Sequence, residues 1–133
     1  MEAENTNPRQ NEAPDKYAAY VNWLTENNCI FPRVEYPARF GNEELIGARA
    51  ICDIPPSKAF MFVSHKVIIT AKKAKNSEIG FILNAEKSLF VKAEKAGHNT
   101  LDLFVMYEKL KGYKSFWRPY LEIVDGMDLA MYW

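Results

Sequence analysis

The chain has 133 residues, of which 48% are hydrophobic and 26% are charged, and this composition excludes a wholly disordered or collagen-like protein and fits one globular domain. Its 17 basic and 17 acidic side chains cancel, so no excess positive charge draws the protein onto nucleic acid. No apolar run approaches the length of about 18 residues that crosses a bilayer, and no signal sequence is apparent. We therefore expect a cytoplasmic or nuclear protein with neither a nucleic-acid nor a membrane partner.

The first 14 residues are rich in Asn, Glu, Gln and Pro, and they predict a disordered tail because they offer little apolar surface to offset the entropy of folding. The first helix is expected to follow Asp15, whose side chain can cap it, and to stop near Asn27 and Asn28. Apolar residues recur at helical spacing in between, namely Tyr17, Tyr20, Val21 and Leu24.

Between residues 31 and 70, short apolar runs are interrupted by Pro and Gly, which predicts several short strands. These strands centre on Val34, on residues 46–51 and on residues 59–63. Asp53 and Ile54, followed by two prolines, predict a turn between the last two strands, because proline fixes φ and cannot donate to a ladder.

Helical periodicity returns after residue 70. Ser77 is a candidate cap for a helix that includes Ile82 and Leu83, and a further helical segment is expected over residues 89–95. The clearest helix is expected to follow Asn99 as its cap and to end before Gly112. Its apolar residues lie on nearly every side and predict deep burial: Leu101, Phe104, Val105, Tyr107 and Leu110.

The last stretch is dense in aromatic residues and finishes on Ala130, Met131, Tyr132 and Trp133. An apolar terminus of this kind needs a surface to cover it, so we expect either a protein partner or a missing C-terminal half of the protein to do so.

Isolated reactive residues favour structural roles. His65 and His98 fall in different elements without carboxylates at ligand spacing, so no metal site is expected. Ser64 and His65 are neighbours whose side chains point to opposite faces of a strand, which excludes a nucleophile and base pair. Cys29 and Cys52 are interpreted as reduced packing residues.

Two clusters of side chains, one basic and one aromatic, could serve either to bind a ligand or to stabilise the fold. A basic cluster comprises Lys72, Lys73 and Lys75. It could meet an acidic partner, but the neutral total charge favours a solvated face. An aromatic cluster comprises Phe116, Trp117 and Tyr120. It could stack on a nucleobase, but core packing is the favoured interpretation.

Four stretches of residues 17–133 resemble, in the same order, the SET-domain protein methyltransferases, and in particular the group of the Rubisco large-subunit and actin-histidine enzymes. Residues 23–28 (WLTENN) look like the opening "W..ENG", and residues 43–54 (EELIGARAICDI) resemble "E-G-x-G-L-x-A-x-x-D-I". Residues 71–77 (AKKAKNS) follow a similar lysine and serine stretch. Residues 115–121 (SFWRPYL) are similar to "S-F/W-W-x-P-Y-L", where the family's inserted helical subdomain begins.

The resemblance implies an α+β fold in which residues 15–133 form the N-terminal lobe of a SET domain with an N-terminal helix and the first helices of the insert. The family's glycine loop wraps S-adenosylmethionine, and the matching cofactor-binding positions are Glu44, Leu45 and Ile46. Leu45 stands where the family has a glycine, so it adds a Cβ at a close approach to the ligand. The family's donor-binding Asn-His motif and its active-site tyrosine lie beyond the matched part, so no catalytic residue is assigned.

Two functions follow from the resemblance. The first is the N-terminal segment of an S-adenosylmethionine-dependent protein methyltransferase that modifies lysine or histidine and is inactive as this chain alone. The alternative is a non-catalytic, degenerate SET lobe that acts as a structural or interaction subunit of a larger complex.

Overall fold

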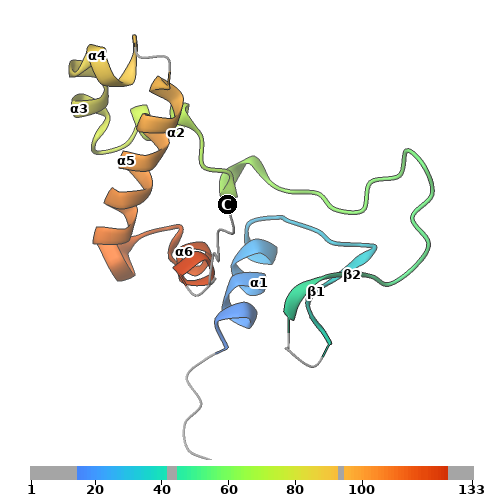
Figure 1. Cartoon of the computed structure of the whole chain (residues 1–133). Helices are drawn as coiled ribbons and strands as arrows, with labels where there is room; N and C mark the ends of the chain where they lie inside the picture. The colour runs from blue at the N-terminus through green and yellow to red at the C-terminus, as the bar shows by residue number, and fades with distance from the viewer. Residues whose placement is uncertain (1–14, 42–44, 93–94, 126–133) are drawn as a thin grey trace, which may run out of the picture.

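The fold is α+β, as expected, and the computed structural model describes residues 15–41, 45–92 and 95–125. Figure 1 shows α2 to α5 gathered at one end, the β1–β2 hairpin at the other, and α1 and α6 between them. The elements in chain order are α1 (Lys16–Glu26), β1 (Val34–Phe40), β2 (Leu45–Ala50), η1 (His65–Val67), α2 (Ala71–Lys75), α3 (Gly80–Ala85), α4 (Lys87–Phe90), α5 (Ala96–Lys111), η2 (Gly112–Lys114) and α6 (Arg118–Asp125). The predicted tail, residues 1–14, and the apolar terminus, residues 126–133, lie outside the described residues.

Helix α1 is confirmed with both of its predicted ends. The Asp15 carboxylate accepts a hydrogen bond from the Tyr17 N–H at 3.0 Å, and Asn27 caps the other end. Trp23 and Leu24 are buried with Cys29 in a first core cluster, which α6 covers from the other side. The helix therefore forms where capping residues bound it at both ends and apolar residues between them lie on the face that packs into the core.

Two of the three predicted strands are confirmed as an antiparallel hairpin. The register runs from Val34 opposite Ala50 to Phe40 opposite Leu45, with a shift between Glu35 and Ala38. Gly41, at the turn, has a φ of 64°, a left-handed conformation that glycine adopts without steric cost.

The prediction of a third strand over residues 59–63 is wrong. This segment belongs to the long stretch that arches away from the hairpin in Figure 1, and it makes only an isolated bridge between Phe62 and Ile30. The Ile30 N–H donates to the Phe62 carbonyl at 3.0 Å, and the Phe62 N–H donates to the Ile30 carbonyl at 2.8 Å.

The neighbours of Ile30 explain why the bridge does not lengthen into a ladder. In the same antiparallel register, Phe60 would face Pro32, which has no N–H to donate. On the other side Ser64 would face Asn28, whose φ of 64° is not a strand conformation. The predicted turn does form, since the Lys58 N–H donates to the Pro55 carbonyl at 3.2 Å.

Both predicted helix caps in the second half of the chain are wrong. The Ser77 hydroxyl donates to the Ala74 carbonyl at 2.6 Å, so it finishes α2 instead of starting α3. Asn99 lies inside α5, where its side-chain amide donates to the Leu89 carbonyl at 3.1 Å. Each polar side chain bonds to a carbonyl of the preceding segment, a contact that the pattern of residues does not reveal. Of the segment predicted over residues 89–95, α4 includes only the first part.

Helix α5 is buried on one face only, so the expectation of deep burial is wrong. Thr100, Phe104 and Glu108 are buried, whereas Met106 and Leu110 are 62% and 87% exposed. The buried face packs on a second core cluster, which consists of Ala74, Ile79, Leu83, Phe90 and Phe104. Through this cluster α2 and α4 pack against α5, and α3 packs against α2 and α4.

A matched pair of leucine substitutions tests this second core. Leu83 is fully buried, so Leu83→Ala is expected to lower the free energy of unfolding by about 2–5 kcal/mol, because it leaves a cavity. Leu110→Ala on the exposed face is expected to change it by no more than about 0.5 kcal/mol. Urea unfolding followed by circular dichroism measures both, and equal effects would contradict the assignment of the core.

Candidate functional site

The predicted donor-binding positions lie at the start of β2. Leu45 is opposite Phe40 and is 61% exposed, and Ile46 is opposite Arg39. Glu44 lies outside the described residues. Neither Leu45 nor Ile46 lines either of the two cavities described next, so their role in binding a donor stays a prediction.

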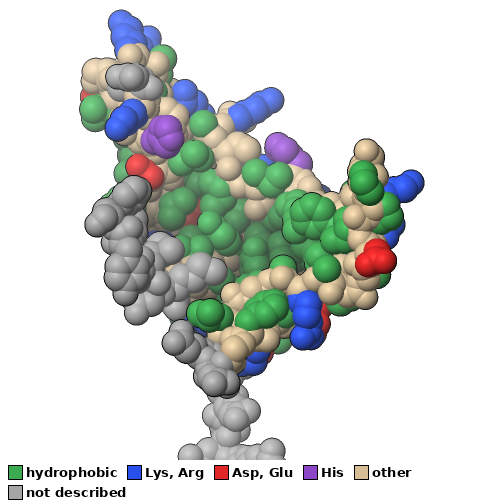
Figure 2. All heavy atoms as spheres, turned by 45° about the vertical axis from the view of Figure 1, so that its right-hand side comes forward, with side chains coloured by type: hydrophobic (Ala, Val, Ile, Leu, Met, Phe, Trp, Pro, Cys, Tyr) green, Lys and Arg blue, Asp and Glu red, His purple; other side chains and the backbone are tan. Residues whose placement is uncertain are grey.

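The first of these, which we call the aromatic cavity, has a volume of about 420 Å³. Figure 2 shows a hollow in the molecular surface in which hydrophobic side chains gather. The cavity is lined by residues of α1, of the loop before β1, of the segment around η1 and of α6: Tyr20, Trp23, Leu24, Phe31, Met61, Val63, Val67, Ile69 and Tyr120. A surface of this kind suits an apolar ligand or an apolar polypeptide segment.

Tyr20 is the centre of the aromatic contacts in this cavity. Its ring stacks on Trp23 with the centroids 5.9 Å apart, and lies 6.4 Å from the ring of Tyr120 on α6. Burial, followed by the nearby phenols of Tyr36 and Tyr120, raises the pKa of Tyr20 above the ordinary tyrosine value. The phenol therefore stays neutral, and the wall of the cavity is uncharged at this point.

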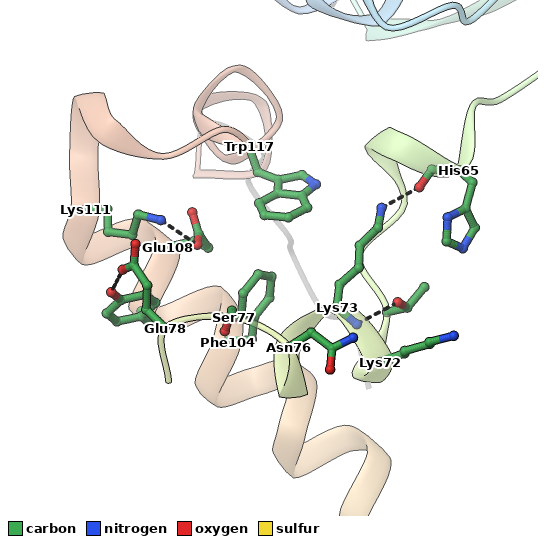
Figure 3. A pocket seen from close by; sticks show the side chains of 12 residues that line it. His65, Lys72, Lys73, Asn76, Ser77, Glu78, Phe104, Glu108, Lys111 and Trp117 are labelled. Carbon is green, nitrogen blue, oxygen red and sulfur yellow. Dashed lines mark hydrogen bonds and ion pairs between the residues drawn. The ribbon is translucent and has the colours of Figure 1, made fainter. Parts of the chain in front are cut away.

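The second, which we call the charged cavity, has a volume of about 570 Å³ and lies between η1, α2 and α5, as Figure 3 shows. Its lining includes charged, polar and aromatic side chains: His65, Thr70, Lys72, Lys73, Asn76, Ser77, Glu78, Phe104, Tyr107, Glu108, Lys111 and Trp117.

Lys73 is a structural tie in this cavity, so the expectation that its basic cluster forms a solvated face is wrong for this residue. Its ammonium group donates to the carbonyls of Lys66 and Ile68 at 2.8 Å each, and also to that of His65. It lies 5.9 Å from the centre of the Trp117 ring. Burial lowers the pKa of Lys73. The accepting carbonyls lie five to eight residues before Lys73, in η1 and just after it. This short spacing is the one feature of the sequence that could have indicated the contact.

Glu108 links the end of α5 to the start of α6. Its carboxylate is almost fully buried, and it accepts hydrogen bonds from the Ser115 hydroxyl at 2.6 Å and from the Lys111 ammonium at 3.0 Å. The Ser115 oxygen in turn accepts from the Trp117 N–H at 3.2 Å. This network pairs a buried charge, which would otherwise be costly, and it fixes the position of Trp117.

The remaining acid of the charged cavity is also engaged. Tyr107 donates its hydroxyl to Glu78, and this hydrogen bond is the main reason why the pKa of Tyr107 is raised. The Ser64 oxygen accepts from the Lys66 N–H at 3.3 Å, so it caps η1. Among residues 15–41, 45–92 and 95–125 no group of three or more His, Cys, Asp or Glu side chains could hold a metal ion.

The predicted packing residues have mixed outcomes. Cys29 is buried, whereas Cys52 is exposed, so the packing interpretation is confirmed for the first and wrong for the second. Trp117 packs against both core clusters, with its ring 5.2 Å from that of Phe104. Phe116, by contrast, is 43% exposed. Sequence reasoning placed these aromatic residues in a core and missed that Tyr120 forms a cavity wall.

None of the helices in the described part of the chain has the length and apolar character needed to cross a membrane.

No family model matches the chain. The chain is similar to the actin-histidine N-methyltransferase of Dasypus novemcinctus, with 30% identity over 112 residues, which are 84% of this chain and 18% of that protein. The same enzyme of Gallus gallus is also 30% identical over 112 residues, and that of Homo sapiens is 29% identical, again over 84% of this chain and 18% of each relative. The chain thus spans about a fifth of the length of the curated relatives it matches, and it is related to a segment of a protein methyltransferase.

Replacing Lys73 tests whether it ties η1 to α2. Lys73→Met keeps most of the length of the side chain but removes the ammonium group that donates to three carbonyls, so we expect the free energy of unfolding to fall by about 1 kcal/mol. Lys72→Met removes a neighbouring charge from an exposed residue and serves as the control, with an expected change within about 0.5 kcal/mol. Urea unfolding measures the difference, and indistinguishable midpoints would refute the tie.

The pH dependence of stability tests the buried phenol in the aromatic cavity. The pKa of Tyr20 is higher in the folded than in the unfolded chain, so its contribution is complete below about pH 10 and is lost as the pH rises further, because the unfolded chain loses its proton first. Tyr20→Phe is expected to make this alkaline loss shallower. The check is the urea midpoint of both proteins from pH 7 to 11. Below pH 9 the urea midpoints of the two proteins should change with pH in the same way. If they do so up to pH 11 as well, the raised pKa of Tyr20 is contradicted.

Proposed function

We propose that this chain is the N-terminal segment of an S-adenosylmethionine-dependent protein methyltransferase that modifies lysine or histidine side chains. The observation that carries the proposal is the 30% identity to actin-histidine N-methyltransferases over 84% of the chain. The α+β arrangement, with a strand hairpin followed by a series of helices, supports it. On this proposal residues 15–133 are the first part of a SET domain, including the start of its helical insert, in a protein of the cytoplasm or nucleus.

The donor site of the proposed enzyme includes Glu44, Leu45 and Ile46. The exposure of Leu45, at 61%, supports this role, because its side chain at the start of β2 is accessible to a ligand. The other groups that enclose the donor come from the rest of the protein. Methyl transfer requires donor and acceptor to be held in line within one closed pocket, so the chain alone is inactive.

Actin is the first acceptor to test, because it is the substrate in the name of the relatives. In the reaction the methyl group leaves the sulfonium sulfur and bonds to an imidazole nitrogen of histidine. The carbon–sulfur bond breaks, S-adenosylhomocysteine departs and the nitrogen loses a proton. Lysine remains the second acceptor class.

The alternative is a non-catalytic lobe that serves as an interaction subunit. Two observations favour it: Leu45 occupies a position where the resembled family has glycine, and apolar side chains line an open hollow of the surface. Both proposals require a polypeptide to cover apolar surface, namely the C-terminal half of the same protein in the first case and another chain in the second.

The intact mass of the protein from its own cells discriminates between the two proposals. We expect a mass well above 15.3 kDa, and transfer of a labelled methyl group from S-adenosylmethionine to actin by the native protein but not by the 133-residue chain. A native mass near 15.3 kDa, or a larger protein that labels neither histidine nor lysine, would support the non-catalytic lobe.

Substitution of Leu45 in the full-length protein tests the donor loop itself. Leu45→Gly removes the Cβ and permits positive φ, so calorimetry is expected to show several-fold tighter binding of S-adenosylmethionine. Leu45→Ala is the matched control, because it removes the bulk of the side chain but keeps the Cβ. A lack of any gain with glycine over alanine would argue against a donor loop at this position.

A further inference from the structure

The charged cavity contains hydrogen-bond donors that the fold does not use. Within the part of the chain that the structure describes, the side chains of His65, Lys72 and Asn76 line this cavity and form no hydrogen bond or ion pair. All three residues are exposed. Lys111 donates to Glu108 and keeps further capacity, because an ammonium group can donate more than once. Donors of this kind bond to solvent or to a ligand.

The acids of the same cavity are already engaged. Glu78 accepts from the Tyr107 hydroxyl, and the buried Glu108 accepts from two neighbouring side chains. Three lysines and two glutamates line the cavity, so the lining has a charge of +1 when its histidine is neutral. A cavity with unused donors and an excess of positive charge selects a ligand that is negatively charged and rich in acceptors.

The unused donors lie on two sides of the cavity. Figure 3 shows His65 and Lys72 on the side of η1 and α2, and Lys111 on the side of α5. A tetrahedral phosphate presents oxygens in several directions, whereas the two oxygens of a carboxylate lie in one plane. Among the described residues that line the cavity, the cationic side chains are lysines and not arginines, whose planar fork matches a carboxylate. This arrangement favours phosphate over carboxylate.

The wall between these two sides is partly apolar. Phe104 and Trp117 line it, as Figure 3 shows, and the cavity volume of about 570 Å³ is of the size that holds an organic ligand. Covering an apolar wall with an apolar group is favourable because it removes both surfaces from water. The ligand that fits is therefore an organic group that carries a phosphate.

We propose that the charged cavity binds a small organic phosphate monoester. Lys72, His65 and Lys111 bind the phosphate oxygens, and the organic group lies against Trp117. Lys73 contributes positive charge alone, because its ammonium group already donates to three carbonyls. This site goes beyond the proposed function and does not rest on it, since every group that forms the site belongs to the described chain.

Titration of the native protein with phenyl phosphate tests the site. Calorimetry is expected to give a Kd below about 1 mM, and the urea midpoint is expected to rise with the concentration of the ligand, because the ligand binds the folded state. Inorganic phosphate and benzoate are the comparison ligands. Each is expected to bind at least about fivefold more weakly, since the first lacks the organic group and the second lacks the phosphate.

Each other result of these titrations overturns the proposal. Neither heat nor a change in the urea midpoint would show that the native protein has no such site. Equal binding of benzoate would show that the cavity does not select phosphate. Equal binding of inorganic phosphate would show that the apolar wall contributes nothing to the affinity.

A matched pair of lysine substitutions locates the site. Lys72→Gln removes a charged donor from the lining, so the affinity for phenyl phosphate is expected to fall about fivefold. Lys75→Gln removes the same charge from the same helix at a residue outside the lining, and is expected to change the affinity by less than about 1.5-fold. Equal losses would indicate general attraction to surface charge and would contradict the site. The urea midpoints without ligand check that both variants fold.

A phosphotyrosine peptide distinguishes a free ester from a phosphorylated polypeptide, because it presents the same ring and phosphate as phenyl phosphate. The proposal requires the peptide to bind no more tightly than phenyl phosphate. Binding of the peptide at least about tenfold more tightly, with a loss in Lys72→Gln, would overturn the assignment to a small ester and identify the cavity as a site for phosphorylated protein.

Discussion

The packing of Trp117 holds the helical part of the structure together. Its ring meets Phe104 of α5 edge-on, and the residue also packs against the cluster of α1 around Trp23. Three neighbours fix it in place: Ser115 accepts from its backbone N–H, Glu108 holds Ser115, and the Lys73 ammonium lies over the ring. Each of the two core clusters is too small to be stable alone. An aromatic ring shared between them adds buried apolar area and fixes their relative orientation through its edge-to-face contact. The indole N–H of Trp117 is buried and has no acceptor among the described residues, a cost that this packing must exceed.

The polar groups near this tryptophan are used to build the fold. Glu108 is bonded to Ser115 and Lys111, Glu78 is bonded to Tyr107, and Lys73 is bonded to three carbonyls. Groups whose hydrogen-bonding capacity is already satisfied have little left for a reacting substrate. Polar groups that are already hydrogen-bonded fit a chain that contributes a surface to a larger catalytic unit. They fit equally well a lobe that only binds other proteins.

Local signals in the sequence predicted elements whose causes are local. Asp15 and Asn27 bound α1 because capping requires only neighbouring backbone groups, and Gly112 ends α5 with a positive φ for the same reason. The hairpin followed from two β-prone runs joined by a short turn at Gly41. Ser77 and Asn99 misled because each can cap a helix that follows it, yet both bond to a carbonyl before it. The charged cavity was not predicted, because it joins η1 to the distant α5.

The sequence by itself determined the α+β class, the first helix and the hairpin. It also showed a resemblance to protein methyltransferases, and the chain is indeed similar to a segment of such proteins. Only the tertiary structure decided that one face of α5 is exposed, that Lys73 ties η1 to α2, and that residues 59–63 remain without a ladder. The physical reason is the range of the interactions. Propensity and capping act within one turn of chain, whereas a strand depends on the residues that happen to lie beside it, and here Pro32 and Asn28 limit its pairing to a single bridge.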